Sequence, residues 1–242
     1  MRTLVLSDIH ANLVALEAVL ADAGQWDRLW FLGDLVGYGP DPNECVERLR
    51  DLGPSTALSG NHDWAVLDKL DTEEFNDDAR RLVRWTRRQM NDDNLAYLDG
   101  LPPLHVAAPY YTLAHASPRH AVWEYILDLP TAQENFGYFD TPICLVGHSH
   151  IPALFLLDEA GLNFYLLDDG ETVDLTQGRM IANPGSVGQP RDGDPRASYA
   201  ILDDEARTWT LHRVVYDIAE TQRRMRAHKL PPRLIDRLEF GM

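Results

Sequence analysis

Five of the nine histidines in the 242-residue sequence lie where buried strands are expected to end, and four of the five are within three residues of an Asp, Asn or Gly. A random scatter of histidines would not select that context. The segments are Ser7-Asp8-Ile9-His10, Gly33-Asp34, Gly60-Asn61-His62-Asp63, His115-Ala116-Ser117-Pro118 and Gly147-His148-Ser149-His150. Carboxylate, imidazole and carboxamide groups are hard and borderline donors, and this mixture suits Mn²⁺, Fe, Zn²⁺ or Ni²⁺ better than Ca²⁺.

The spacing of these segments predicts that they meet at one edge of a sheet. Asp8 precedes Asp34 by 26 residues, and Asp34 precedes Asn61 by 27. Each interval is close to one strand–helix–strand passage, and ligands of open α/β sheets bind at the carboxyl ends of the strands. The donors are too many for one ion, and a shared carboxylate can bridge two ions about 3.5–4 Å apart. We therefore expect a site for two divalent metal ions.

The elements that must position these segments are short buried strands alternating with helices in the first half of the chain, which indicates a parallel sheet. Strands are expected at 3–7, 29–32 and 56–59, and helices at 12–23, 42–52, 76–90 and 92–98, with Asn76 as a candidate cap. The second half is richer in strands, at 104–107, 110–114, 143–147, 153–157, 163–167, 172–175, 180–182, 197–202 and 208–213, with helices at 131–138, 217–227 and 231–238. We expect one domain, 1–242, in which two sheets pack together with helices outside.

The composition excludes several classes of protein. The formal charge of −16, from 22 basic and 38 acidic residues, opposes sequence-independent nucleic-acid binding and binding to an anionic membrane surface. The longest apolar run, 151–157, is far shorter than the ~20 residues of a membrane span. No secretory signal develops before Asp8, and two cysteines make no disulfide framework, so we expect a cytoplasmic protein.

The ordered motifs Asp-x-His, Gly-Asp, Gly-Asn-His-Asp, His and Gly-His-x-His resemble those of the calcineurin-like metallophosphoesterase superfamily. The resemblance runs from Ser7 to His150. The later segment from Asn183 to Arg191 looks like the tail motif of the small bacterial and archaeal phosphodiesterases of that superfamily. The resemblance implies an α/β fold of two packed mixed β-sheets flanked by helices, a four-layer α/β/β/α sandwich.

The same resemblance implies a set of site residues. Asp8, His10 and His150 would hold one metal, Asn61, His115 and His148 would hold the second, and Asp34 would bridge them. His62 would face the substrate, and Asp63 would orient the His62 ring. Ala11 departs from the Gly that many relatives carry after the Asp-x-His motif, and we expect this to alter the loop but not the metals.

Several residues carry two interpretations. Asn12 is a candidate contact for the substrate phosphate or a helix N-cap, and Asn183 and Arg191 are candidate substrate contacts or parts of a structural turn. Trp64 could stack a base or pack in the core. The arginine stripe formed by Arg80, Arg84, Arg87 and Arg88 could bind an acidic ligand, although a solvated face that pairs with nearby acids is favoured.

The resulting hypothesis is a two-metal hydrolase of phosphate esters, most simply a phosphodiesterase. A metal-bridging water would be the nucleophile, and His62 would protonate the departing oxygen. The substrate would be a small phosphate ester or nucleotide. Dinucleoside polyphosphate hydrolysis and phosphomonoester hydrolysis are the alternatives, and a non-enzymatic scaffold is disfavoured because no ligand is missing. The native metal among Mn, Fe, Ni and Zn, and the oligomeric state, stay open.

Overall fold

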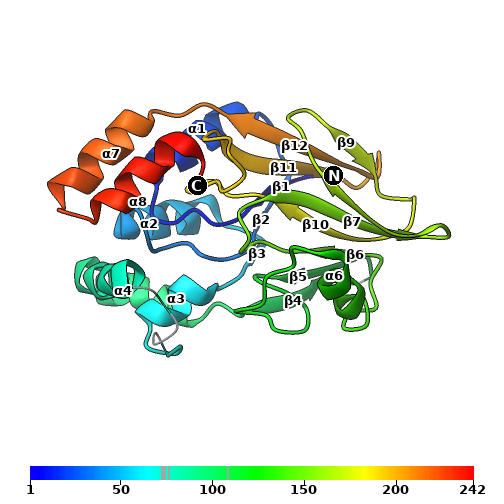
Figure 1. Ribbon diagram of the computed structural model, residues 1–242, viewed down its shortest axis with the longest axis horizontal. Coiled ribbons are helices and arrows are strands. Elements are labelled where there is room, and N and C mark those ends of the chain that lie inside the picture. The colour runs from blue at the N-terminus through cyan, green and yellow to red at the C-terminus, as the bar shows by residue number, and fades with distance from the viewer. Residues whose placement is uncertain (72–74, 76, 108) are drawn as a thin grey trace.

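The chain forms two six-stranded sheets that face each other, with helices on their outer sides (Figure 1). The computed structural model describes residues 1–71, 75, 77–107 and 109–242. The strand order in the first sheet is β3 (Thr56–Ala57), β2 (Arg28–Phe31), β1 (Arg2–Leu6), β11 (Ala197–Asp203), β12 (Thr208–Val214) and β9 (Thr172–Asp174). The order in the second sheet is β4 (Leu104–Ala107), β5 (Tyr111–Ala114), β6 (Ile143–Leu145), β10 (Arg179–Pro184), β7 (Pro152–Asp158) and β8 (Gly161–Leu166).

Both sheets are mixed, as the expected sandwich requires. Strands β1, β2 and β3 run parallel, as do β5, β6 and β10, while the remaining neighbours pair antiparallel. The predicted four-layer α/β/β/α fold is therefore confirmed. The helices are α1 (Leu13–Asp22), α2 (Pro42–Leu52), α3 (Asn61–Val66), α4 (Asp77–Gln89), α5 (Asp92–Asp99), α6 (Leu129–Asn135), α7 (Ile218–Ala227), α8 (Pro232–Asp236) and the 3₁₀ turn η1 (Arg237–Phe240).

Alternating side chains of the central strands fill two separate apolar layers. In β1, Leu4 and Leu6 face the helices of the first sheet, while Val5 faces the second sheet. In β2, Phe31 belongs to the helix side and Trp30 to the layer between the sheets. Successive side chains of a strand point to opposite faces, so burial on both faces produces the continuous apolar runs that the sequence shows.

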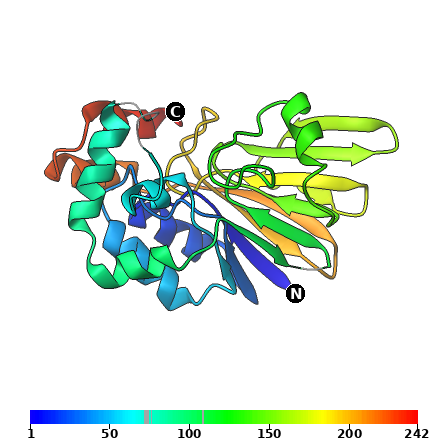
Figure 2. The same cartoon turned by 90° about the horizontal axis from the view of Figure 1, so that it is seen from below.

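The C-terminal segment packs against α4 at one end of the molecule (Figures 1 and 2). Leu82 of α4 is buried in one cluster with Met225, Leu234 and Leu238. On the outer side of α4, Arg80 pairs with Asp77, and Arg87 lies 3.0 Å from an Asp68 carboxylate oxygen. These pairs agree with a solvated arginine face. The candidate cap Asn76 lies outside the described residues.

Most predicted elements agree with the observed ones to within one or two residues, but two differences stand out. Helix α3 begins at Asn61, four residues after the last residue of β3, where no helix was predicted from the sequence. The expected 231–238 helix divides into α8 and η1, which turns the chain at Arg237.

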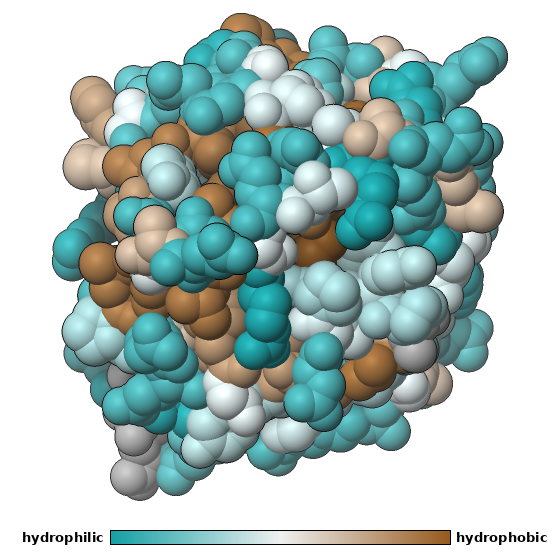
Figure 3. Space-filling model, turned by 90° about the vertical axis from the view of Figure 1, so that its right-hand side faces the viewer, coloured by the Kyte–Doolittle hydropathy of each residue, from teal (hydrophilic) through white to brown (hydrophobic). Residues whose placement is uncertain are grey.

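The opposite end of the molecule, away from α4 and α7, has apolar areas interrupted by hydrophilic side chains (Figure 3). Among the described residues, no helix is both long enough and apolar enough to cross a membrane.

Candidate metal centre

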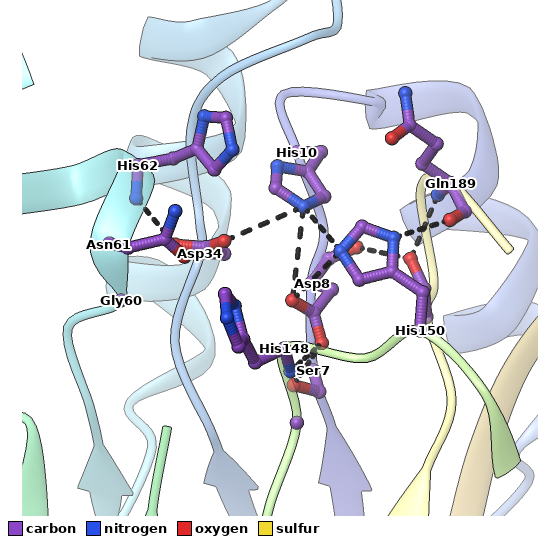
Figure 4. A network of polar contacts seen from close by, with 12 residues as sticks. Ser7, Asp8, His10, Asp34, Gly60, Asn61, His62, His148, His150 and Gln189 are labelled. Atoms are coloured by element: carbon purple, nitrogen blue, oxygen red, sulfur yellow. Dashed lines mark hydrogen bonds and ion pairs between the residues drawn. The ribbon is translucent and has the colours of Figure 1, made fainter. Parts of the chain in front are cut away.

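The predicted ligands lie together at the carboxyl ends of strands from both sheets (Figure 4). Asp8 and His10 follow β1, Asp34 follows β2, and Asn61 follows β3 at the start of α3. The second sheet contributes His115 after β5, and His148 and His150 after β6. Ligand atoms of Asp8, His10, Asp34 and His150 lie within 4.8 Å of one another, and so do those of Asp34, His115 and His148. Asp34 belongs to both groups, and all six residues are buried.

Hydrogen bonds to backbone carbonyls fix the tautomers of three histidines. The Nδ1 atom of His10 lies 3.2 Å from the oxygen of Val36, and that of His115 lies 2.9 Å from the oxygen of Leu32. The Nδ1 atom of His150 lies 2.5 Å from the oxygen of Gln189. A carbonyl oxygen only accepts, so each Nδ1 carries the proton and each Nε2 presents a lone pair.

These lone pairs converge on one another without a proton between them. The Nε2 atoms of His10 and His150 are 3.0 Å apart, and Nε2 of His150 is 3.3 Å from Oδ1 of Asp8. Within the described residues, Asp8 Oδ1, Asp34 Oδ2 and His148 Nε2 are buried with no hydrogen-bond partner. Buried acceptors without donors are costly, and a cation satisfies them together. The donor set therefore fits divalent metal ions.

The oxygens of the two carboxylates that face away from the cluster are held by the protein. Asp8 Oδ2 accepts hydrogen bonds from the hydroxyl of Ser7 at 2.6 Å and from the backbone N–H of His148 at 3.0 Å. Asp34 Oδ1 accepts from the backbone N–H of His62 at 2.9 Å. Such partners fix the orientation of a metal ligand. Asn61 completes the second group, with its Oδ1 3.3 Å from Nε2 of His115.

The backbone at the cluster adopts the left-handed conformation that non-glycine residues rarely take. The φ angles are +54° at Asp8, +49° at His10 and +57° at Asp34, and His148 and His150 are at +64° and +61°. Each such residue costs on the order of 1–3 kcal/mol, and such strain clusters at functional sites. Ala11, which departs from the Gly of many relatives, has a φ angle of +52°.

Burial shifts the pKa values of the side chains in the cluster so that their uncharged forms are favoured. It raises the pKa of Asp8, and it raises that of Asp34 further, together with the negative charges of Asp63 and Asp8. Burial also lowers the pKa of His10, His115, His148 and His150. A bound cation reverses this preference for the carboxylates, because it stabilises their ionised form.

Asp63 does not orient the ring of His62, and this expectation was wrong. Its carboxylate accepts hydrogen bonds from the backbone N–H groups of Gly60, Asp34, Leu35 and Val36 at 2.9–3.3 Å. The start of α3 directs Asp63 to the loop after β2, so it fixes Asp34 instead. Burial still raises the pKa of Asp63 to about 6.

His62 lies beside the cluster rather than in it. Its ring centroid is 5.0 Å from that of His10 and 4.4 Å from that of Tyr38. In the described part of the chain, no hydrogen bond engages its imidazole. A Cβ on Gly37 would approach Nδ1 of His62 to 2.7 Å, so this position requires glycine. Burial lowers the pKa of His62, and the charge of Arg191 lowers it further.

The three candidate substrate contacts behave differently. Asn12 caps α1, accepting from the N–H of Ala15 at 3.1 Å, and its amide donates to Gly188. Asn183 is also occupied, since its amide donates to the oxygens of Gly147 and Ser149. Both are buried structural residues, so the N-cap and turn interpretations hold for them. Arg191 instead directs its charge at the cluster, where it lowers the pKa of His10, His62, His148 and His150.

Aromatic side chains that the sequence did not single out surround the cluster. Tyr125 stacks on His148 at 3.9 Å between ring centroids, and Trp123 stacks on Phe75 at 5.2 Å. Tyr38, with a φ angle of +58°, contacts His10 and His62. These residues come from three separate segments of the sequence, around positions 38, 75 and 123–125, and no local pattern marks them. Trp64, for which base stacking and core packing were the two interpretations, is partly buried, and Nζ of Lys69 lies 6.0 Å from its ring centroid.

Comparisons with known proteins agree with this fold and site. The sequence model of the calcineurin-like phosphoesterase superfamily domain matches residues 1–207. The crystal structure of a metallophosphoesterase from Sphaerobacter thermophilus is 50% identical, with a TM-score of 0.93 over the whole of both chains. The uncharacterized protein MJ0912 of Methanocaldococcus jannaschii is 40% identical over 98% of this chain and 97% of its own. A symmetrical bis(5′-nucleosyl)-tetraphosphatase from Pectobacterium atrosepticum is 36% identical over 37% of each chain.

The two-sheet sandwich and its buried carboxylate–histidine cluster define a metal-dependent phosphoesterase. The chain belongs to the calcineurin-like phosphoesterase superfamily.

Proposed function

We propose that this protein is a phosphodiesterase that works with two divalent metal ions. The observation that carries the proposal is the convergence of unprotonated nitrogens and unpaired carboxylate oxygens in two groups that share Asp34. One ion would be held by Asp8, His10 and His150, and the second by Asn61, His115 and His148. Manganese, iron, nickel and zinc all suit these donors.

Two bound cations would supply Lewis-acid chemistry, since they make water acidic near neutral pH and offset negative charge on phosphoryl oxygens. The protein's own part is to hold the reacting groups in place. Strained loops and carbonyl-bound histidines fix the ligands before any substrate arrives. Such preorganisation avoids a reorganisation cost during the reaction.

His62 is the proposed general acid for the departing oxygen. It is buried beside His10, and its imidazole has no hydrogen bond within the described residues, so it is free to donate to a substrate. A phosphate anion beside the ring favours the protonated imidazole, which counteracts the lowering of its pKa by burial and by Arg191. A positioned acid contributes typically about 10²–10⁴-fold.

Arg191 is the proposed contact for the substrate phosphate. Its Nη2 donates to Oε1 of Gln189 at 3.0 Å, while its buried Nε has no partner in the part of the chain that the structure describes. A guanidinium suits phosphate because its planar fork donates two parallel hydrogen bonds. Asn12 and Asn183 are left out of the proposed contacts, because their side chains are already engaged.

A second candidate function is hydrolysis of dinucleoside polyphosphates. The partial match to a symmetrical bis(5′-nucleosyl)-tetraphosphatase favours it, and both functions use the same reacting groups. Either substrate is a small phosphate ester, and we propose that it is processed by a single domain in the cytoplasm.

A hydrolysis screen tests the proposal. The purified protein, freed of metal and reloaded with Mn²⁺, Fe²⁺, Ni²⁺ or Zn²⁺, is assayed on phosphomonoesters, phosphodiesters and dinucleoside polyphosphates. We expect a diester to have the highest kcat/KM with at least one metal. A preference for dinucleoside polyphosphates would favour the second candidate, and a preference for monoesters would contradict both.

A further inference from the structure

Two arginines beside the cluster have no Asp or Glu partner among the described residues. The guanidinium carbons of Arg191 and Arg237 lie 5.6 and 5.9 Å from the centroid of the Tyr38 ring. Arg191 hydrogen-bonds to the side chains of Gln189 and Tyr125, and Nε of Arg237 donates to the main-chain oxygen of Met242, the last residue of the sequence. Their remaining donors are available to a ligand.

The absence of an Asp or Glu partner is unusual for an arginine of this chain. It has 38 acidic residues, and many of its other arginines are paired. Arg28 lies 3.1 Å from a carboxylate oxygen of Asp204, and Arg196 lies 2.7 Å from one of Asp194. Two like charges held beside one ring with no Asp or Glu side chain next to them favour the binding of an anion.

The electrostatics of Arg237 agree with this geometry. Burial lowers the pKa of Arg237 to about 10, and the charge of Arg191 contributes to the decrease. At neutral pH both side chains remain protonated. The pair is therefore a preformed receptor for negative charge.

The two arginines lie at different depths relative to the histidines. The backbone N–H of Arg191 donates to the oxygen of His150 at 3.3 Å, whereas Arg237 lies at the start of η1 in the C-terminal segment. Arg237 also lines a cavity of about 580 Å³ with Asp78, Arg233, Leu234, Asp236, Phe240 and Met242. Arg191 is thus placed to contact the phosphoryl group that reacts, and Arg237 lies farther from the histidine cluster.

Packing fixes Arg237 in this place. It starts η1, which follows α8, and the neighbouring Leu234 and Leu238 are buried against α4 and α7. The N–H of Gly193 donates to the oxygen of Gly241 at 3.0 Å, which ties the C-terminal segment to the loop after Arg191. Figure 2 shows the C-terminus beside this loop.

We propose that Arg237, together with Arg191, forms a subsite for a second phosphoryl group joined directly to the one that is hydrolysed. The inference rests on the proposed metal-dependent hydrolysis of phosphate esters and favours the substrate class of its second candidate, esters with contiguous phosphates. The rest of such a substrate would extend toward the cavity that Arg237 lines. The walls of that cavity carry charges of both signs, so Arg237 rather than the cavity as a whole recognises the anion.

Equilibrium binding of AMP and ADP tests the subsite, because these probes share base and ribose and differ by one phosphoryl group. Titration calorimetry is done on metal-loaded protein, with the same excess metal in both solutions. We expect the wild type to bind ADP at least about tenfold more tightly than AMP. Arg237→Ala should reduce this ratio to less than about threefold. Arg237→Lys should keep part of it, because lysine retains the charge but not the planar fork.

Arg233→Ala is the matched control, since Arg233 is an exposed arginine of α8 on the same cavity. It should keep the wild-type ratio, and thermal melting checks that every variant is folded. A wild-type ratio near one, or equal losses of AMP and ADP affinity in Arg237→Ala, would overturn the subsite. Because binding needs no turnover, an inactive wild type that still shows an Arg237-dependent ratio would refute the proposed function alone.

Discussion

Most side chains of the ligand cluster are held by a second hydrogen bond to the backbone. The side chains at its rim, His62, Tyr38, Arg191 and Arg237, instead meet one another around the ring of Tyr38. In the cluster, the histidines that follow β1 and β5 bind carbonyl oxygens through Nδ1, and the carboxylates of Asp8 and Asp34 bind backbone N–H groups. At the rim, Tyr38 contacts the other three through its ring.

The cluster and its rim have different tasks, namely metal binding and substrate binding, and their side chains are held accordingly. A metal ligand must point in one direction, and partners of this kind supply that constraint. A substrate contact must meet a group that arrives and leaves, and unpaired donors beside aromatic rings allow this. Substitutions in the cluster should therefore remove metal, whereas substitutions at the rim should change kinetics with the metal retained.

The largest effect is expected from Asp34→Ala, because Asp34 alone belongs to both ligand groups. We expect clearly less than two metal ions per chain and a loss of activity of about 10³-fold or more. Elemental analysis and kcat/KM measure the two effects. Asp51→Ala, which removes an exposed carboxylate, should change neither. Wild-type metal content in Asp34→Ala would show that Asp34 is not a shared ligand.

At the rim, His62→Asn should slow hydrolysis of a diester with an alkyl leaving group by about 10²–10⁴-fold. A nitrophenyl diester should lose far less, because nitrophenolate leaves without a proton. The ratio of the two losses in kcat/KM is the readout, with metal content near wild type. The exposed His105 provides the control variant His105→Asn. Equal losses on both substrates would assign His62 to substrate binding, and metal depletion would make it a ligand.

A smaller effect is expected from Arg191→Ala, about 10–100-fold in kcat/KM on the best substrate, through a higher KM or a lower kcat. The metals should stay bound, because no ligand atom is removed. Arg207→Ala, an exposed arginine, is the charge-matched comparison. Unchanged kinetics would leave Arg191 with a structural role only.

The smallest effect concerns stability. Ala11→Gly should raise the free energy of unfolding by about 0.5–1 kcal/mol, because the φ angle of +52° strains alanine but not glycine. For a chain of this size that is roughly 1–4 °C in Tm. Ala15→Gly in α1 should instead lower stability by about 1 kcal/mol. A destabilised Ala11→Gly would mean that the entropy of glycine outweighs the strain.

The sequence predicted the cluster well because each ligand lies next to the end of a strand whose position is set by local apolar patterning. Asp8, Asp34 and Asn61 could therefore be predicted as metal ligands without any knowledge of side-chain packing. Asp63 was misassigned because its neighbour in the sequence was taken as its partner, while the first turn of α3 directs it to backbone N–H groups. Arg237 comes close to Tyr38 because the C-terminal segment packs beside the cluster. No local sequence pattern predicts this packing.

The most direct test of the account is a metal titration of the wild-type protein after exhaustive chelation, with metal content and diester hydrolysis followed together. The metal-free protein should not hydrolyse the diester, and activity should rise with added Mn²⁺, Fe²⁺ or Ni²⁺ and saturate at two ions per chain. Metal should also raise the Tm, on the order of 10 °C at a large excess over Kd. Full hydrolysis with metal content verified as zero would contradict the central claim.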